Sequence, residues 1–272
     1  MEAQPLAGRT VAVPETRELE VFAGLLERRG ARVLRCPLVS IRDAPDPEPV
    51  LAFARDFAGG ACDDLILTTG EGLRRLLACI ARHEPTLSAG FLAALGRVRK
   101  ITRGPKPVRA LRELGLKADL SAGEPTTAGI IATLSAENLT GRRCGVQLYG
   151  TLPNTPLCDF LVRAGATVRT VAPYVYAPAA DDAAVQGLLA ELGAGRVDAI
   201  AFTSTPQVER LFTAAPQEQV RAVLARTLVA AVGPVVAAAL ARHGVRARLM
   251  PEDAFFLKPL TSALEEALAG RP

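Results

Sequence analysis

Two apolar runs in the chain end in small polar residues of the kind that hold anions. The polar residues are Thr69 and Gly70 after the run 64–67, and Thr203 and Ser204 after the run 199–202. Where such a turn begins a helix, the free N–H groups and the positive end of the helix dipole bind carboxylates or phosphates. Threonine, serine and glycine are also common in any turn between a strand and a helix, so a purely structural role is an equal alternative.

Each of these turns needs a buried strand before it and an amphipathic helix after it. The run 199–202 suits a parallel strand that is covered on both faces, and Val208, Leu211 and Phe212 have the spacing of an apolar helical face. Strands and helices alternate in the same way along the rest of the chain. The sequence therefore predicts an α/β fold with parallel sheets and right-handed crossovers.

Three blocks of sequence recur in the same order in the two halves of the chain. The blocks are 8–13 with 141–146, 25–33 with 160–168, and 104–120 with 233–249. This repetition predicts two similar α/β domains whose strand-end loops line a cleft. The further residues that we expect in these loops are Arg103, Gly104, Tyr149, Gly150, Gly233 and Pro234.

The sequence lacks the motifs of most nucleotide and hydrolase chemistry. The first strand ends in Val13-Pro-Glu-Thr-Arg17, without the glycines of a dinucleotide-binding turn, and no P-loop or G-x-S-x-G motif is present. The chain has 2 histidines and 5 cysteines, and no cysteines form a C-x-x-C pair. We therefore expect no metal and no cofactor, and we interpret the cysteines as reduced core residues. The pair Asp63-Asp64 at the start of a strand is interpreted as structural.

The net charge of +4 comes from basic residues that are spread singly over the chain. This pattern gives no sign of a nucleic-acid partner, and it fits a small anionic ligand. A signal peptide is not evident, and no uncharged apolar run reaches about 18 residues. We expect a cytoplasmic monomer that binds neither nucleic acid nor a membrane.

Several short motifs, taken in order, resemble the uroporphyrinogen-III synthase family from about residue 8 to residue 268. They are the Gly-Pro helix openings at 104 and 233, the strand end Phe202-Thr-Ser204 and the segment Val171-Ala-Pro-Tyr-Val-Tyr176. The sequence departs from the family pattern at Thr68-Thr-Gly70, where a Thr-Ser-x-Asn type of strand end is more usual. It also has Val235 where many members have threonine.

The resemblance implies that the chain crosses twice between its two domains, which have HemD-like, flavodoxin-like layers. One domain would be discontinuous, with residues 1–35 and 178–272, and the other would be continuous, with residues 42–170. The segments 36–41 and 171–177 would form a two-stranded connector. Each of these two segments contains a proline, which suits an extended connector better than the centre of a sheet.

The resemblance also implies an activity in heme biosynthesis that needs no cofactor. The substrate would be hydroxymethylbilane, a linear tetrapyrrole with many carboxylates, and the lyase product would be uroporphyrinogen III, formed with loss of water and inversion of ring D. Tyr174 matches the family's tyrosine after the crossover strand and would donate a proton to the leaving hydroxyl, because tyrosine stays protonated at neutral pH. The strand-end turns would contact the ligand. Arg17 could bind a carboxylate, or it could lie in solvent.

Two other hypotheses stay open. A non-catalytic member of the family could bind a tetrapyrrole or another anion as a regulator, since two-lobed α/β proteins close around ligands. A transferase with the same architecture is the other, and the absence of a nucleotide motif speaks against it.

Overall fold

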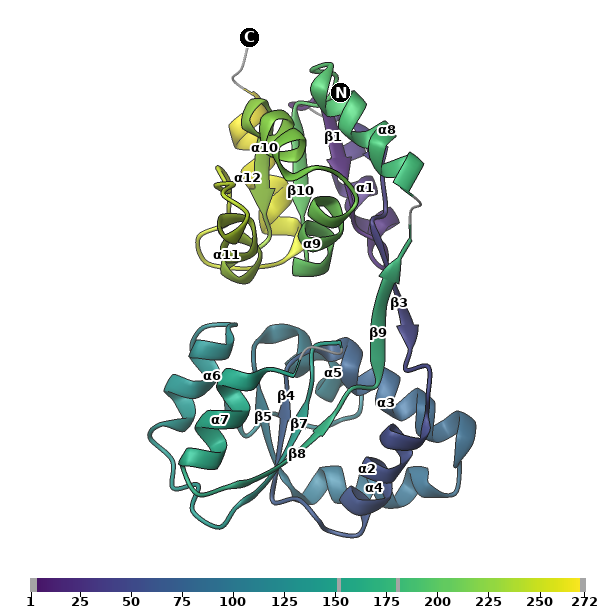
Figure 1. Cartoon of the computed structure of the whole chain (residues 1–272), viewed down its shortest axis with the longest axis vertical. Coiled ribbons are helices and arrows are strands. Elements are labelled where there is room, and N and C mark those ends of the chain that lie inside the picture. The colour runs from purple at the N-terminus through teal and green to yellow at the C-terminus, as the bar shows by residue number, and fades with distance from the viewer. Residues whose placement is uncertain (1–3, 151–152, 180–181, 270–272) are drawn as a thin grey trace. The chain divides into compact units, whose positions relative to one another are not determined.

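The computed structural model describes residues 4–150, 153–179 and 182–269, and it divides the chain into two compact units (Figure 1). Unit 1 comprises Met1–Ser40 and Ala177–Pro272, and unit 2 comprises Ile41–Tyr176. The chain leaves unit 1 within β3 (Val39–Asp43) and returns within β9 (Tyr174–Pro178), and these two strands pair with each other. The domain boundaries expected from the sequence stay predictions. The division between the units falls inside the expected connector segments.

Unit 1 is built on a four-stranded parallel sheet with the strand order β11-β10-β1-β2. Its strands are β1 (Thr10–Val13), β2 (Arg32–Arg35), β10 (Ala199–Phe202) and β11 (Leu228–Ala231). Its helices are α1 (Leu19–Glu27), α8 (Asp182–Gly193), α9 (Thr205–Thr213), α10 (Gln217–Arg226), α11 (Pro234–Arg242) and α12 (Leu257–Ala269). The strand predicted at 199–202 is confirmed as β10, which is buried along its whole length.

Unit 2 is built on a five-stranded parallel sheet with the strand order β6-β5-β4-β7-β8. Its strands are β4 (Asp64–Leu67), β5 (Arg99–Thr102), β6 (Leu120–Ser121), β7 (Arg143–Gln147) and β8 (Thr167–Val171). Its helices are α2 (Glu48–Ala58), α3 (Gly70–His83), α4 (Leu87–Arg97), α5 (Pro105–Arg112), α6 (Thr127–Leu134) and α7 (Thr155–Arg163).

Successive residues of β4 face two different cores of unit 2. Leu65 and Leu67 pack with residues of α2, α3 and α4, whereas Ile66 packs with residues of α6 and α7. Figure 1 shows α6 and α7 on one side of the sheet and α2 and α4 on the other. Because side chains alternate across a strand, a continuous apolar run is what a strand covered on both faces requires.

The structure differs from the predicted alternation of strands and helices in two crossovers. Two helices, α3 and α4, connect β4 to β5, and α9 and α10 connect β10 to β11. No clear signal in the sequence marks α4, which contains Gly90 and Gly96, because glycine disfavours a helix. Helix α1 begins at Leu19, and the N–H groups of Arg17 and Glu18 before it bind the carboxylate of Glu15. Among the described residues no helix combines the length and the apolar character needed to cross a membrane.

A buried carboxylate joins the amino ends of the central strands of unit 2. Asp64 has a fully buried side chain and accepts hydrogen bonds from Arg99 Nε (2.6 Å) and Arg142 Nη2 (2.7 Å). Burial acts to raise the pKa of Asp64, but the hydrogen bonds from Arg142 and Arg99 outweigh it and hold that pKa below its usual range. The structural role predicted for the acidic pair fits this cluster, in which Asp63 binds Arg143.

We expect the protein to lose stability as the pH falls from about 4 to about 2. Hydrogen bonds from Arg143 lower the pKa of Asp63 to about 2 in the folded protein, whereas an unfolded aspartate titrates near about 3.9. The unfolded chain therefore takes up protons first, so this contribution is complete above the unfolded pKa and disappears as the pH falls through the folded pKa. The pKa values of Asp43, Asp64 and Asp119 are shifted in the same direction. Thermal unfolding at a series of pH values measures the effect, and a constant midpoint from about pH 5 to about pH 2 would contradict it.

Candidate functional site

The carboxyl ends of β4, β5 and β7 bring several predicted site residues to one edge of unit 2. These three strands are neighbours in the sheet and run parallel, so the turns that follow them lie together. The predicted residues in these turns are Thr69, Gly70, Arg103, Gly104, Tyr149 and Gly150. Tyr174 joins them from β9, since its hydroxyl lies 3.2 Å from Oγ1 of Thr69.

Thr69 caps α3 and is itself held by a buried glutamine. Its Oγ1 accepts a hydrogen bond from the N–H of Gly72 (2.9 Å), and its own N–H donates to Oε1 of Gln147 (3.0 Å). A Cβ atom at position 72 would overlap the side-chain amide of Gln147, so glycine leaves the space that the amide fills. The N–H group of Thr69 is therefore occupied by the chain's own glutamine.

The glycines of these turns permit close contact between neighbouring backbone segments. A Cβ atom on Gly70 would lie 2.5 Å from the carbonyl oxygen of Lys106, and one on Gly104 would lie 2.8 Å from Cβ of Pro125. Packing alone thus accounts for glycine at both positions. Their contact with a ligand stays a prediction.

Replacing Gly70 with alanine is expected to lower the free energy of unfolding by about 1–3 kcal/mol, because the new methyl group must push α3 away from the backbone of α5. Denaturant unfolding measures the change. Gly96→Ala is the matched control, since a Cβ atom there meets nothing within 4 Å and the helix should gain about 0.5–1 kcal/mol. Equal unfolding midpoints for Gly70→Ala and the wild type would contradict the packing argument.

All 3 tyrosines of the chain meet at this edge of unit 2. The ring centroid of Tyr176 lies 5.5 Å from that of Tyr149 and 5.4 Å from that of Tyr174. Tyr174 is fully buried, whereas Tyr149 and Tyr176 are half-buried. Burial and the neighbouring hydroxyls of Tyr149 and Tyr174 raise the pKa of Tyr176 well above its usual range, so this hydroxyl stays protonated.

Gly150 shapes this cluster through its backbone. Its φ of +61° is in the left-handed region that favours glycine, and a Cβ atom there would lie 3.1 Å from the ring of Tyr176. Glycine at position 150 therefore lets the turn after β7 place Tyr149 against Tyr176 without backbone strain or crowding of the Tyr176 ring.

Arg103 faces the tyrosine cluster without an acidic partner. Its guanidinium carbon lies 5.2 Å from the ring centroid of Tyr149, and the side chain is half-buried. Desolvation lowers the pKa of Arg103, and the groups that act on it electrostatically are the three tyrosines. No ion pair of Arg103 with a carboxylate occurs in the part of the chain that the structure describes. A guanidinium in this condition can pair with an incoming carboxylate or phosphate.

In unit 1, the corresponding edge holds a carboxylate of the chain itself. Glu15, after β1, is 8% exposed and accepts hydrogen bonds from Oγ1 of Thr203, from Nε2 of Gln207 (3.1 Å) and from the N–H of Arg17 (3.0 Å). Oε1 of Gln207 accepts the N–H groups of Thr203 (2.8 Å) and Ser204 (3.2 Å). The groups that the sequence assigns to a ligand anion are thus bound to Glu15 and Gln207. Ligand contact at Thr203 and Ser204 stays a prediction, and it requires exchange of these bonds.

The remaining predicted residues of unit 1 lie in turns at the same edge of its sheet. Gly233 and Pro234 begin α11 after β11, and a Cβ atom on Gly233 would lie 3.0 Å from Cγ of Phe255. Arg17 follows β1 and is exposed. Glycine at 233 is therefore explained by the close approach of the segment that carries Phe255.

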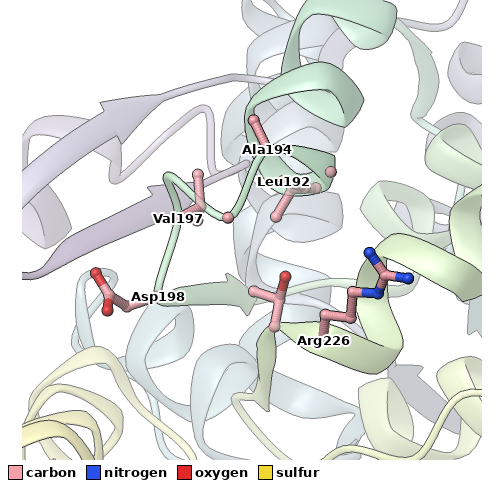
Figure 2. Close-up of a pocket in the computed structure, with 8 residues that line it drawn as sticks. Leu192, Ala194, Val197, Asp198 and Arg226 are labelled. Carbon is pink, nitrogen blue, oxygen red and sulfur yellow. The ribbon is translucent and has the colours of Figure 1, made fainter. Parts of the chain in front are cut away.

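A pocket of about 330 Å³ in unit 1 lies away from these turns (Figure 2). Its lining includes Leu192, Val197, Asp198 and Arg226. Asp198 immediately precedes β10, so this pocket is at the amino ends of the strands, whereas α/β proteins bind ligands at the carboxyl ends. Asp198 also accepts the N–H of Thr10 (2.8 Å), which gives it a structural role in joining β1 to β10.

Comparison with known proteins identifies the family of the chain. Residues 20–256, which include parts of both units, match the sequence model of the uroporphyrinogen-III synthase HemD family. The chain belongs to this family.

The HemD family also accounts for the fold. The chain is similar to a mutant uroporphyrinogen III synthase from the extremely thermophilic bacterium Thermus thermophilus, with 29% identity and a TM-score of 0.75 over 97% of this chain and 100% of that chain. The wild-type enzyme of that bacterium in another crystal form gives 31% identity and a TM-score of 0.59 over 96% and 98%. The "Uncharacterized protein YjjA" of Bacillus subtilis (strain 168) is 33% identical over 254 residues, which cover 91% of this chain and 92% of that protein. The family and the two-domain α/β class inferred from the sequence are confirmed.

Four residues that organise the HemD-like turns were not among the predicted site residues. They are Glu15, Gln147, Tyr176 and Gln207. Gln207 gave a usable signal, because glutamine three residues after Ser204 completes a capping box. Gln147 can bind the N–H of Thr69 only because Gly72 leaves space for its side-chain amide. Since Gln147 and Gly72 are far apart in the sequence, only the three-dimensional structure shows this contact.

Proposed function

We propose that the protein is a uroporphyrinogen-III synthase, a lyase that converts hydroxymethylbilane into uroporphyrinogen III with loss of water and inversion of ring D. The observation that carries this proposal is the family match over residues 20–256. Arg103, without an acidic partner at the carboxyl edge of the unit 2 sheet, supports it, since the substrate is a polycarboxylate.

The main task of such a site is to orient a flexible substrate. In free solution, bringing the reacting ends of a linear tetrapyrrole together costs conformational entropy. A site that holds these ends together removes this cost from the activation barrier, by up to about 7–11 kcal/mol in well-oriented reactions. Arg103 supplies a guanidinium for a carboxylate, and Tyr149 supplies a ring face and a hydroxyl beside it. Thr203, Ser204, Gly233 and Arg17 are the proposed contacts in unit 1.

Tyr174 is the proposed proton donor for the leaving hydroxyl. Its hydroxyl is held by Thr69 in the structure, so we propose that the substrate hydroxyl takes the place of Thr69 as its partner. Proton transfer to the hydroxyl breaks the C–O bond and releases water, while the pyrrole nitrogen supplies the electron pair. A pyrrole carbon later loses a proton when the ring closes, and this proton restores Tyr174.

The isomer of the product tests the proposal. Purified protein is mixed with enzymatically generated hydroxymethylbilane, and the porphyrins obtained after oxidation are separated into isomers. We expect the type III isomer, whereas the type I isomer alone, which is the spontaneous product, would refute the proposal.

A second candidate is a non-catalytic protein that binds a tetrapyrrole or another polycarboxylate. Glu15 favours it over the synthase, because its negative charge beside Thr203 opposes binding of an anion at the turn that follows β10, so that the anion would be held by the turns of unit 2 without this second set of contacts. Such a protein would give only type I product in the isomer assay. It would still be stabilised against thermal unfolding by the ligand, to a degree set by the ratio of ligand concentration to Kd.

A further inference from the structure

The tyrosine cluster of unit 2, formed by Tyr149, Tyr174 and Tyr176, contains every tyrosine of the chain. Only 3 tyrosines and no tryptophan occur among 272 residues, yet the three rings form one contiguous group. The core clusters of the two units consist of aliphatic residues, phenylalanine and a few cysteines. Packing alone does not require hydroxyl groups at this edge, because a buried tyrosine hydroxyl must find a partner, whereas phenylalanine needs none.

Among the described residues, the cation beside this cluster, Arg103, has no ion pair with a carboxylate. Arg99 and Arg142, at the other edge of the same sheet, both pair with Asp64. Arg103 instead faces the ring of Tyr149 and has lost part of its hydration. Partial desolvation of a charge is unfavourable unless an opposite charge or good hydrogen bonds replace the lost water. A carboxylate bound to Arg103 would provide both.

The rings define the kind of carboxylate that fits. Tyr149 and Tyr176 are half-buried, so each has some surface open to a ligand beside Arg103. An electron-rich aromatic ring can stack against them, which adds about 0.5–1.5 kcal/mol to the contact. The hydroxyl of Tyr176 is hydrogen-bonded to those of Tyr149 and Tyr174, so a hydroxyl that donates to the second carboxylate oxygen must exchange one of these bonds.

We propose that Arg103, Tyr149 and Tyr176 form a subsite of unit 2 that binds one aromatic ring of the ligand together with its carboxylate. Arg103 pairs with the carboxylate and Tyr149 contacts the ring. Tyr176 is a positioning residue that holds Tyr149 on one side and Tyr174 on the other. The identity of the ring as a pyrrole rests on the proposed function, but binding does not depend on turnover.

The chain carries its own reporter for this subsite. Since all tyrosines lie in the cluster and tryptophan is absent, tyrosine fluorescence of the unlabelled protein arises only here. Porphobilinogen, a monopyrrole with one acetate and one propionate, is a suitable probe. Its dimethyl ester, which has the same ring without the charges, is the matched control ligand, and inorganic phosphate tests for a general anion site.

Fluorescence titration tests the proposal with the full-length protein. We expect a saturable change with porphobilinogen, with the diester and phosphate at least about tenfold weaker, because only the diacid offers both carboxylate and ring. Arg103→Gln should weaken porphobilinogen binding by roughly 10- to 100-fold, since a charge-assisted pair is lost. Arg109→Gln, which removes the same charge from an exposed position of α5, should bind as the wild type does.

Tyr176→Phe separates positioning from packing, because it keeps the ring and removes only the hydroxyl. We expect a several-fold weaker affinity, on the order of the loss of one hydrogen bond, and a small fall in the thermal midpoint, because the hydroxyl also bonds to those of Tyr149 and Tyr174. Affinity equal to that of the wild type would show that Tyr176 only packs. Equal binding of diacid and diester, equal binding of phosphate, or wild-type affinity of Arg103→Gln would each overturn the subsite.

The outcomes also separate this subsite from the proposed function. If the protein gives only type I product but Arg103→Gln loses porphobilinogen, the subsite stands and the synthase activity does not. If type III product forms while Arg103→Gln has an unchanged KM and an unchanged titration, the activity stands and the subsite is refuted.

Discussion

Asp64→Asn is expected to lower the free energy of unfolding by about 3–5 kcal/mol, the range found when one partner of a buried ion pair is removed. The Asp64 carboxylate is fully buried between the guanidinium groups of Arg99 and Arg142. An asparagine has nearly the same shape but no charge, and its amide nitrogen would point a donor at one of the two arginines. Arg142 would lose the carboxylate with which it pairs, whereas Arg99 would keep its ion pair with Glu137 (2.6 Å). Denaturant unfolding with a constant m-value measures the loss.

Asp63→Asn is the matched control at the adjacent position. The Asp63–Arg143 pair is exposed, with 34% and 49% of the two side chains accessible, so its loss should cost at most about 1 kcal/mol. Asp198→Asn makes the same comparison in unit 1, where Asp198 pairs with Arg9 at 3.3 Å and is 31% exposed. If Asp64→Asn destabilised the protein no more than these two variants, the buried cluster would not hold the strands of unit 2 together.

The position of this cluster separates stability from ligand binding. Asp64 begins β4, and Thr69 follows the end of the same strand, so the cluster and the candidate site lie at opposite edges of the sheet. Folded Asp64→Asn should therefore bind porphobilinogen as the wild type does. The charge of Asp64 is neutralised locally by Arg99 and Arg142, so its loss should have little electrostatic effect on the candidate site.

Local patterns were sufficient to predict the strands, the turns and the family. The apolar run at 199–202 predicts a buried strand, and the hydroxyl residues after it predict the start of a helix. Both signals depend only on residues close together in the sequence. The repeat of Gly-Pro at 104 and 233 likewise predicts two helix openings, which the structure confirms as α5 and α11.

Contacts between distant segments were not predictable in the same way. In unit 1, Gln207 of α9 itself caps the N–H of Thr203, whereas in unit 2 the comparable amide comes from Gln147 of a neighbouring strand, into the space above Gly72. The sequence repeat does not reveal that the two glutamines play the same part, because they do not occupy matching positions in the two halves. Glu15 belongs to the segment Val13–Arg17, which we used only to argue against a dinucleotide-binding turn. Only the fold shows that the Glu15 carboxylate accepts a hydrogen bond from the hydroxyl of Thr203.

The tyrosine cluster illustrates the same limit. Tyr149 and Tyr174 were predicted separately, one as a strand-end residue and the other from the family resemblance. Tyr176, two residues after Tyr174 on β9, brings the two rings into one group. This contact depends on the course of the chain from β7 through β8 to β9, which a sequence pattern does not encode.

Tyr174→Phe is expected to lower kcat for uroporphyrinogen III formation by roughly 10- to 100-fold. This lies at or below the lower limit of about 100-fold for a general acid, because an electron-rich pyrrole expels a hydroxyl group with little assistance. The substitution also removes the 3.2 Å hydrogen bond to Thr69, which should cost about 0.5–1.5 kcal/mol of stability. Steady-state kinetics with separation of the type I and type III isomers measures the catalytic effect, and thermal unfolding measures the structural one.

Tyr176→Phe distinguishes an acid from a neighbour that only orders the cluster. It should raise KM while kcat changes by less than about threefold, since it weakens binding without removing the proton donor. Tyr174→Phe should show the reverse, a lower kcat with a nearly constant KM. If kcat and the proportion of type III isomer were unchanged in Tyr174→Phe, this tyrosine would have no acid role. The role of Tyr174, which is fully buried beside Thr69, would then be structural alone. The half-buried side chains of Tyr149 and Arg103 would be the part of unit 2 that contacts the substrate.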